Sequence, residues 1–171
     1  IDGDLPNVYL FHGDFMDEEI NELYNHPKVK AHISLTHGEG YGRPLLEASL
    51  SEKPVIAPDW SGHIDFLSKS NAILLGGVLE DVSKNSFPEN FYQEGMKWFT
   101  VNYQEASVKM KDVYKSYRKY TLNAKKLTMF NKSKFSLDSM TVEFGKILDK
   151  YVPEFPKEVK LELPKLNKVS E

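Results

Sequence analysis

The chain has 171 residues and a net charge of -3, and 40% of its residues are hydrophobic. These values are ordinary for a globular domain with a sizeable core, and they give no general sign of nucleic-acid binding. The sequence has no cysteine, which excludes disulfides and thiolate metal ligands, and no apolar run reaches the roughly 18 residues needed to span a bilayer.

The chain begins at Ile1 in an acidic stretch, so we expect no signal peptide there. We also expect the chain to be part of a longer protein, because it does not begin with Met. The lack of cysteine is compatible with a cytoplasmic location, which is our expectation.

Short apolar runs alternate with helical patterns in the first half of the chain. The predicted strands are Val8–Gly13, Ala31–Thr36, Pro54–Pro58 and Ala72–Gly76. One predicted helix starts at Asp17 as its N-cap, and a second runs from Pro44 to about Glu52. This alternation predicts βαβ units, and the continuous apolar strands suit a sheet that is covered on both faces. We therefore predict an α/β fold: a Rossmann-like parallel sheet with flanking helices.

The second half of the chain is predicted to be helical. From Met110 an apolar stripe steps by three and four residues, and a further helix begins near Ser136. The stripe comprises Val113, Tyr117, Tyr120, Ala124 and Leu127, and the inward positions of the further helix are Met140, Phe144, Ile147 and Leu148. We expect Trp98 and Phe99 to anchor the helical part on the sheet. Residues 151–171 read as an extended tail, in which Pro164 limits any strand to an edge.

The region from Lys109 to Lys134 is basic, with Asp112 as its one acid. The lysines fall off the apolar stripe, so a solvated helix face explains them best. Peripheral contact with an anionic membrane surface stays open as an alternative.

The segment "THGEGYGRP" follows a predicted strand and opens a helix, which is where ligands bind in open α/β sheets. Gly40 and Gly42 would let backbone N–H groups approach a phosphate, and Arg43 could add a charged contact. Glu39 and Glu47 would repel phosphate but could accept hydrogen bonds from sugar hydroxyls. The pattern therefore suits a diphosphate between two sugars, although glycines that serve only the turn and a surface pair of Arg43 with Glu47 would explain it too.

None of the five histidines has a metal-ligand spacing, so we expect no metal site. His37 and His63 fall in loops on the predicted ligand side and are candidates for substrate contact. Trp60 lies in the same region, where packing is a simpler role than stacking on a sugar.

The stretch "EGYGRPLLEASLSEKPVIAPDWSGHIDFL" resembles the signature of family 4 retaining glycosyltransferases of the GT-B fold. In that family two glutamates are separated by seven residues, usually as E-G-F-G-x-P-x-x-E-A, and a K-P-V-I-A strand follows. Here the glutamates are Glu39 and Glu47, with Tyr41 in the aromatic position. The likeness extends over roughly residues 5–76.

The resemblance implies a nucleotide-sugar donor domain over residues 1–150, forming the C-terminal half of a GT-B fold. It implies that Gly40, Tyr41 and Gly42 approach the diphosphate, that Glu47 binds the ribose, and that Glu39 is the catalytic residue that contacts the donor sugar. It also implies retention of anomeric configuration, with no cofactor and no metal. The implied partners are a nucleotide sugar, an unknown acceptor and an N-terminal acceptor domain that this chain lacks, with no nucleic acid.

The sequence departs from the family pattern at several points. The strand–helix unit that carries a basic Arg/Lys pair is missing, Leu35-Thr36 replace the usual Pro-Ser, and Ser61-Gly62 replace a Gly-Gly loop. We therefore expect weak donor binding and little turnover from this chain alone. A related epimerase or phosphorylase and a non-catalytic nucleotide-binding domain stay open as alternatives.

Overall fold

The computed structural model describes residues 6–153, with Glu89 described in its backbone only. The chain divides into two compact units, residues 1–136 and residues 137–171, which are described separately below. The division expected from the sequence, at residue 150, stays a prediction because almost all of the predicted tail lies outside the described residues.

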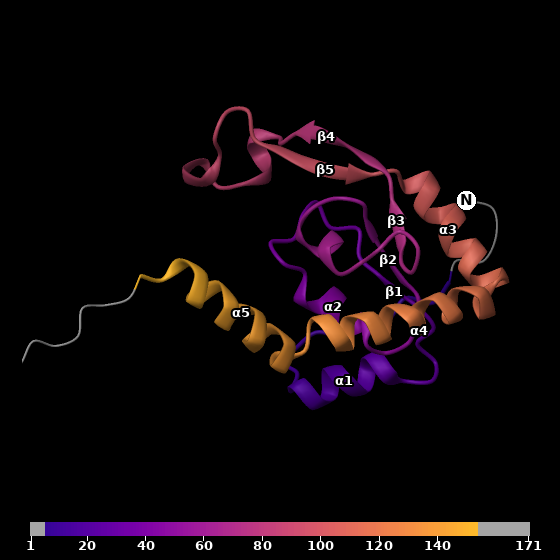
Figure 1. Ribbon diagram of the computed structural model, residues 1–171. Helices are drawn as coiled ribbons and strands as arrows, with labels where there is room; N and C mark the ends of the chain where they lie inside the picture. Colours follow the sequence, from indigo (N-terminus) through magenta and orange to yellow (C-terminus); the bar gives the residue numbers. More distant parts are fainter. Residues whose placement is uncertain (1–5, 154–171) are drawn as a thin grey trace, which may run out of the picture. The chain divides into compact units, whose positions relative to one another are not determined.

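Three short parallel strands form the central sheet of the first unit (Figure 1). They are β1 (His32–Ile33), β2 (Val55–Pro58) and β3 (Ile73–Leu75), in the order β1-β2-β3. His32 lies opposite Val55, and Ile56 lies opposite Ile73. The prediction of a parallel α/β sheet is confirmed.

Helices precede, connect and follow these strands. They are α1 (Asp17–Asn25), α2 (Arg43–Ser49), α3 (Tyr103–Lys115) and α4 (Tyr117–Lys134). Asn102 caps α3, since its side chain accepts hydrogen bonds from the N–H groups of Gln104 and Glu105. Within the described residues, no helix combines the length and apolarity that crossing a membrane requires.

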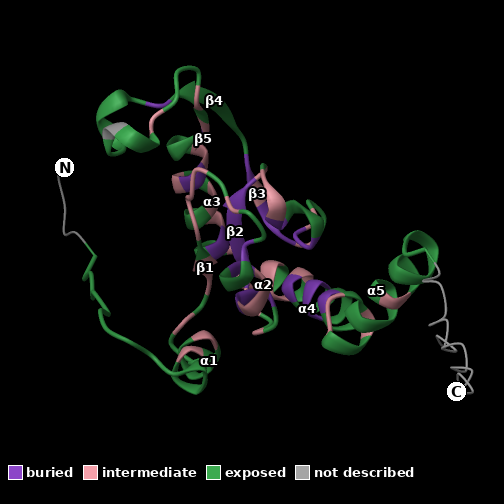
Figure 2. Cartoon of the chain, turned by 90° about the vertical axis from the view of Figure 1, so that its left-hand side faces the viewer, coloured by how far each residue is buried: buried purple, intermediate pink, exposed green. Residues whose placement is uncertain are grey.

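Strand β2 is buried on both of its faces, as its continuous apolar sequence predicts (Figure 2). Val55 and Ala57 belong to one apolar cluster with Leu127 of α4, whereas Ile56 belongs to another with Val113 of α3. The predicted stripe of the helical region is therefore confirmed as a core face.

Buried polar contacts fix α2 against α4. The Thr128 hydroxyl donates to the carbonyl oxygen of Ser49 at 2.7 Å, and the Asn131 amide donates to the Ser49 hydroxyl, also at 2.7 Å. Because buried polar groups are costly when unpaired, these bonds select one seating of α2 on α4. The helix that follows the Gly-rich turn, α2, is thereby held in place by α4.

An antiparallel hairpin, which the sequence analysis did not predict, stands between β3 and α3. It pairs β4 (Gly77–Asp81) with β5 (Lys97–Val101), and its connection carries the short turns η2 (Lys84–Ser86) and η3 (Glu89–Phe91). Gly77 is required here, since a Cβ at this position would lie 2.2 Å from the carbonyl oxygen of Thr100. Only Gly76 separates the end of β3 from the start of β4, so the hairpin follows the central sheet directly.

The predicted strand Val8–Gly13 is wrong. Residues 8–13 form no strand, and Val8 and Leu10 are 88% and 90% exposed. A short apolar run becomes a strand only where a neighbouring strand offers hydrogen bonds, and none of the described residues pairs with this segment.

The second unit contains α5 (Leu137–Tyr151), which buries none of its residues. The helix itself is confirmed, but the prediction that Met140, Phe144, Ile147 and Leu148 face inward is wrong within the described residues, since all four are more than 40% exposed. The apolar stripe shows which side chains could face a neighbour and not whether that neighbour is present.

Candidate functional site

Two loops meet at the carboxyl end of the parallel sheet. We call residues 37–42, which follow β1, the Glu39 turn, and residues 59–62, which follow β2, the Ser61 loop. Adjacent parallel strands end at the same edge, so loops far apart in sequence are brought together there. This edge is where the sequence predicts the ligand site.

Three hydrogen bonds join the two loops at Glu39. The N–H of Glu39 donates to the Ser61 hydroxyl at 3.0 Å, and that hydroxyl donates to the Glu39 carbonyl oxygen at 2.6 Å. The N–H of Gly62 donates to the same carbonyl at 3.0 Å. The backbone of Glu39 is therefore fixed by the neighbouring loop.

The glycines of these loops have distinct roles. A Cβ on Gly62 would lie 2.0 Å from the carbonyl oxygen of Gly40, so only glycine allows this approach. Gly42 has φ of +85° and precedes α2, and a Cβ there would lie 2.9 Å from the Cβ of His63. Gly40 itself faces open space, since a Cβ there would meet no atom within 4 Å. The two loops thus need glycine at Gly42 and Gly62 for packing, and they leave Gly40 accessible.

Ser61 adopts a conformation that normally requires glycine. Its φ is 86° and its ψ is -172°, a region that costs a residue with a side chain about 1–3 kcal/mol. The two hydrogen bonds of its hydroxyl with Glu39 offset this strain. Serine can therefore stand at position 61, where the sequence pattern that the chain resembles usually has glycine.

The polar groups that the Glu39 turn leaves open are those that the sequence predicts to meet a ligand. None of the described residues accepts a hydrogen bond from the N–H groups of Gly40, Tyr41 or Gly42, and none pairs with the Glu39 carboxylate. The Glu39 side chain is half-buried, and Tyr41 is exposed. A fixed backbone here presents one carboxylate and several donors.

Glu47 is placed differently from Glu39. Its Oε1 accepts a hydrogen bond from Arg43 Nε at 2.5 Å, and Arg43 also lies 3.8 Å from Asp17 of α1. This bond with Glu47 raises the pKa of Arg43. The pair that the sequence left as an alternative is thus present, and it occupies one carboxylate oxygen of Glu47.

Glu47 lines a hollow of about 240 Å³ between α1 and α2, together with Arg43 and Tyr24. Burial, and then the nearby Glu47 carboxylate, raises the pKa of the Tyr24 hydroxyl. Glu39 is not among the residues that line this hollow. The structure therefore brings Arg43 and Glu47 together, whereas Glu39 belongs to the junction with the Ser61 loop.

His63 lies in the interior beneath the Glu39 turn. Its Nε2 donates to the carbonyl oxygen of Pro58 at 2.7 Å, and the residue is fully buried. None of the described residues pairs with its Nδ1. In this structure His63 supports the Ser61 loop, and a contact between its ring and a substrate stays a prediction.

Aromatic side chains of the hairpin pack on both loops. The ring of His37 stacks on Trp98 with centroids 4.1 Å apart, and Trp60 stacks on Phe99 with centroids 5.7 Å apart. Sequence reasoning placed Trp98 and Phe99 on the sheet, and Phe99 does belong to the core cluster of β2 and α3. It missed their contact with the two loops, because no local pattern marks a hairpin as a neighbour of the site.

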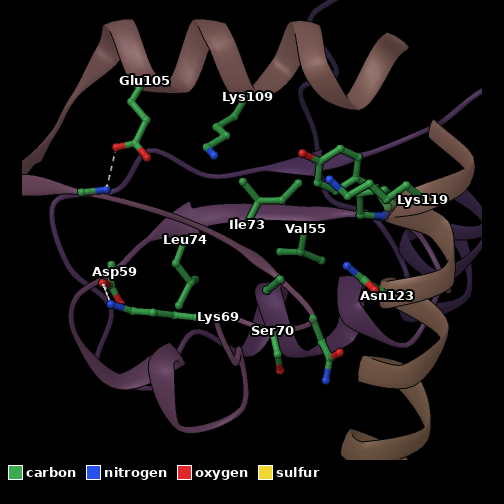
Figure 3. A pocket seen from close by; sticks show the side chains of 15 residues that line it. Val55, Asp59, Lys69, Ser70, Ile73, Leu74, Glu105, Lys109, Lys119 and Asn123 are labelled. Carbon is green, nitrogen blue, oxygen red and sulfur yellow. Dashed lines mark hydrogen bonds and ion pairs between the residues drawn. The ribbon is translucent and has the colours of Figure 1, made fainter. Parts of the chain in front are cut away.

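A second cavity, of about 460 Å³, lies between β3, α3 and α4 (Figure 3). Most of its charged groups have partners: Lys69 pairs with Asp59, and Glu105 accepts a hydrogen bond from the N–H of Gly76 at 3.0 Å. None of the predicted site residues lines it. Within the described residues, no group of three or more His, Asp or Glu side chains is placed to hold a metal ion.

Comparison with known proteins gives a structural likeness and no sequence match. No family model matches the sequence, and no curated protein matches it. The crystal structure of Anabaena HepE in complex with UDP-glucose matches with a TM-score of 0.53 and 19% sequence identity, over 77% of this chain. The chain spans 30% of the length of that protein. The α/β chain, with its parallel three-stranded sheet and flanking helices, thus matches the Rossmann-like C-terminal half of a GT-B fold.

Proposed function

We propose that this chain is the donor-binding part of a retaining glycosyltransferase that uses a nucleotide diphosphate sugar. The observation that carries the proposal is the Glu39 turn, which has a hydrogen-bonded backbone, a carboxylate without a partner among the described residues and free N–H groups at Gly40–Gly42. The shared fold with a protein that binds UDP-glucose supports it.

In this proposal each group acts on one part of the donor. The N–H groups of Gly40, Tyr41 and Gly42 donate to the diphosphate, and Arg43 adds positive charge as the diphosphate leaves. The Glu39 carboxylate accepts hydrogen bonds from hydroxyls of the transferred sugar. No metal is needed if amides and basic side chains stabilise the leaving group.

Glu47 is proposed to bind the ribose. Arg43 Nε engages only Oε1 of its carboxylate, so the other oxygen can accept from a ribose hydroxyl without breaking the pair. Arg43 would then orient the carboxylate as well as contribute charge. The acceptor would bind to a further domain of the parent protein.

Calorimetric titration of the chain with UDP-glucose, GDP-glucose and ADP-glucose tests the proposal. One of the three should bind with a dissociation constant between micromolar and millimolar. Glu47→Ala should remove the preference for the nucleoside diphosphate over inorganic pyrophosphate, and Glu39→Ala should remove the preference for the sugar nucleotide over its parent diphosphate. Glu143→Ala, in the second unit, is the matched control.

Two outcomes would contradict the proposal. The wild-type chain could bind none of the three sugar nucleotides, or both glutamate variants could bind as tightly as the control. Circular dichroism of every variant would show that a lost affinity does not come from unfolding.

A further inference from the structure

We infer that Trp98 of the hairpin is a positioning residue for the Glu39 carboxylate. The inference rests on the proposed function of Glu39 and adds an element, β4–β5, that the family signature does not contain. Trp98 touches neither Glu39 nor a ligand in this inference, and it acts through His37.

Three contacts join His37 to consecutive residues of β5. The His37 ring lies on Trp98 at an interplanar angle of 5°, and its Nδ1 donates to the carbonyl oxygen of Phe99 at 2.8 Å. In return the N–H of Phe99 donates to the carbonyl oxygen of His37 at 3.1 Å. His37 is thereby bound through both its side chain and its backbone, two residues before Glu39.

Phe99 contacts the second loop that holds Glu39, the Ser61 loop, through Trp60. Its ring stacks on Trp60 at an interplanar angle of 7°, and Trp60 covers Gly38, where a Cβ would lie 2.8 Å from Cζ3 of the indole. Trp60 directly precedes Ser61, which holds the backbone of Glu39 from the second loop. Neighbouring residues on a strand point to opposite faces, so Trp98 and Phe99 can each hold a different loop.

These contacts have a functional consequence because none of the described residues pairs with the Glu39 carboxylate. A side chain without hydrogen-bond partners is positioned only by its backbone, and a displacement of about 1 Å can weaken a ligand contact severely. Removing the Trp98 ring leaves the two His37–Phe99 hydrogen bonds in place. The expected loss is therefore partial and confined to the sugar that Glu39 would contact.

The test compares two affinities of each variant. We expect Trp98→Ala to lower the affinity for the NDP-glucose that binds the wild-type chain best by about tenfold, with little change for its parent diphosphate. Trp98→Phe keeps a ring for His37 and should restore most of the difference. Phe91→Ala changes an aromatic residue of the hairpin connection that is 70% exposed, and it should match the wild type.

A role of Trp98 in stability alone would weaken both ligands equally, and that result would overturn the inference. So would a Trp98→Ala chain that keeps the wild-type preference for the sugar. If Trp98→Ala does not fold, Trp98→Leu keeps apolar volume without a flat ring and should show the same selective loss. A wild-type chain that binds no sugar nucleotide would instead overturn the proposed function itself, and the inference with it.

Discussion

The two glutamates of the Gly-rich motif are held in opposite ways. At Glu39 the backbone is fixed by three hydrogen bonds with the Ser61 loop, and none of the described residues binds the carboxylate. At Glu47 the carboxylate is bound by Arg43, while the backbone is part of an ordinary helix seated on α4. The same residue type thus meets two different requirements within one short motif.

Because of this difference, we expect the two regions to respond differently to substitution and to pH. The Glu39 turn depends on close backbone contact between two loops, so a change that adds even one carbon atom where the two backbones touch, as at Gly62, should be severe. The Glu47 region depends on side chains around a solvent-facing hollow, so changes there should be milder and should depend on pH. The following predictions test that contrast, from the largest expected effect to the smallest.

Gly62→Ala should have the largest effect. Its Cβ would lie 2.0 Å from the backbone oxygen of Gly40, which cannot rotate away, and we expect a loss of about 3 kcal/mol in the free energy of unfolding. Gly40→Ala is the matched control, because its Cβ would meet no atom within 4 Å. Urea denaturation of both variants measures the difference, and equal midpoints would show that the two loops are not in close contact.

Ser61 should respond to substitution in a way that separates strain from hydrogen bonding. Ser61→Ala keeps the strained backbone and loses both hydroxyl bonds, so we expect it to reduce the free energy of unfolding by about 2 kcal/mol. Ser61→Gly loses the same bonds but relieves the strain, so it should be close to the wild type in thermal denaturation. If Ala were the more stable of the two, Ser61 would not hold the conformation described here.

Acidification should weaken the Glu47 region through His32. The His32 ring packs edge-on against Tyr24 and lies 3.2 Å from the hydroxyl of Ser51, and both partners line the same hollow as Glu47. Burial, and then the charge of Lys53, lowers the pKa of His32. The unfolded chain therefore takes up this proton first.

The sign of the pH effect follows from that order of protonation. The contribution of His32 to stability is complete above the ordinary histidine pKa of about 6.5 and is lost as the pH falls through the lowered folded-state pKa. We expect denaturation midpoints of the wild type to fall between pH 7 and pH 5 by more than those of His32→Gln. Parallel pH profiles of the two proteins would contradict this.

Glu39→Gln should have almost no effect on stability. The carboxylate has no partner among the described residues, so the free energy of unfolding should change by less than about 0.5 kcal/mol. The measurement is the same urea denaturation. A large loss would mean that Glu39 is a structural residue, and it would remove the reason to regard its free carboxylate as functional.

The sequence predicts those parts of the fold that depend on local pattern. Strands β2 and β3 follow from continuous apolar runs, and the core face of α3 and α4 follows from a stripe with helical spacing. Residues 8–13 and the apolar face of α5 have equally clear patterns and yet are exposed. Pattern shows what a segment can bury, whereas burial needs a partner that the segment does not encode.

The candidate site shows the same limit. The motif identifies Glu39, Gly40 and Gly42 from their spacing, but the residues that hold them come from far along the chain. Ser61 lies 22 residues from Glu39, and Phe99 lies 62 residues from His37. Contacts of this kind depend on which loops meet at the sheet edge, and no local periodicity in the sequence reports that.

The packing of Trp60 and Trp98 has a practical consequence. They are the only two tryptophans in the sequence, and they touch His37 and Gly38, the two residues that precede Glu39. Fluorescence excited at wavelengths that tryptophan absorbs and the nine tyrosines do not therefore reports on this neighbourhood. A compound that shifts either loop should change the emission wavelength or the quantum yield of this tryptophan fluorescence, so its binding can be followed without a label.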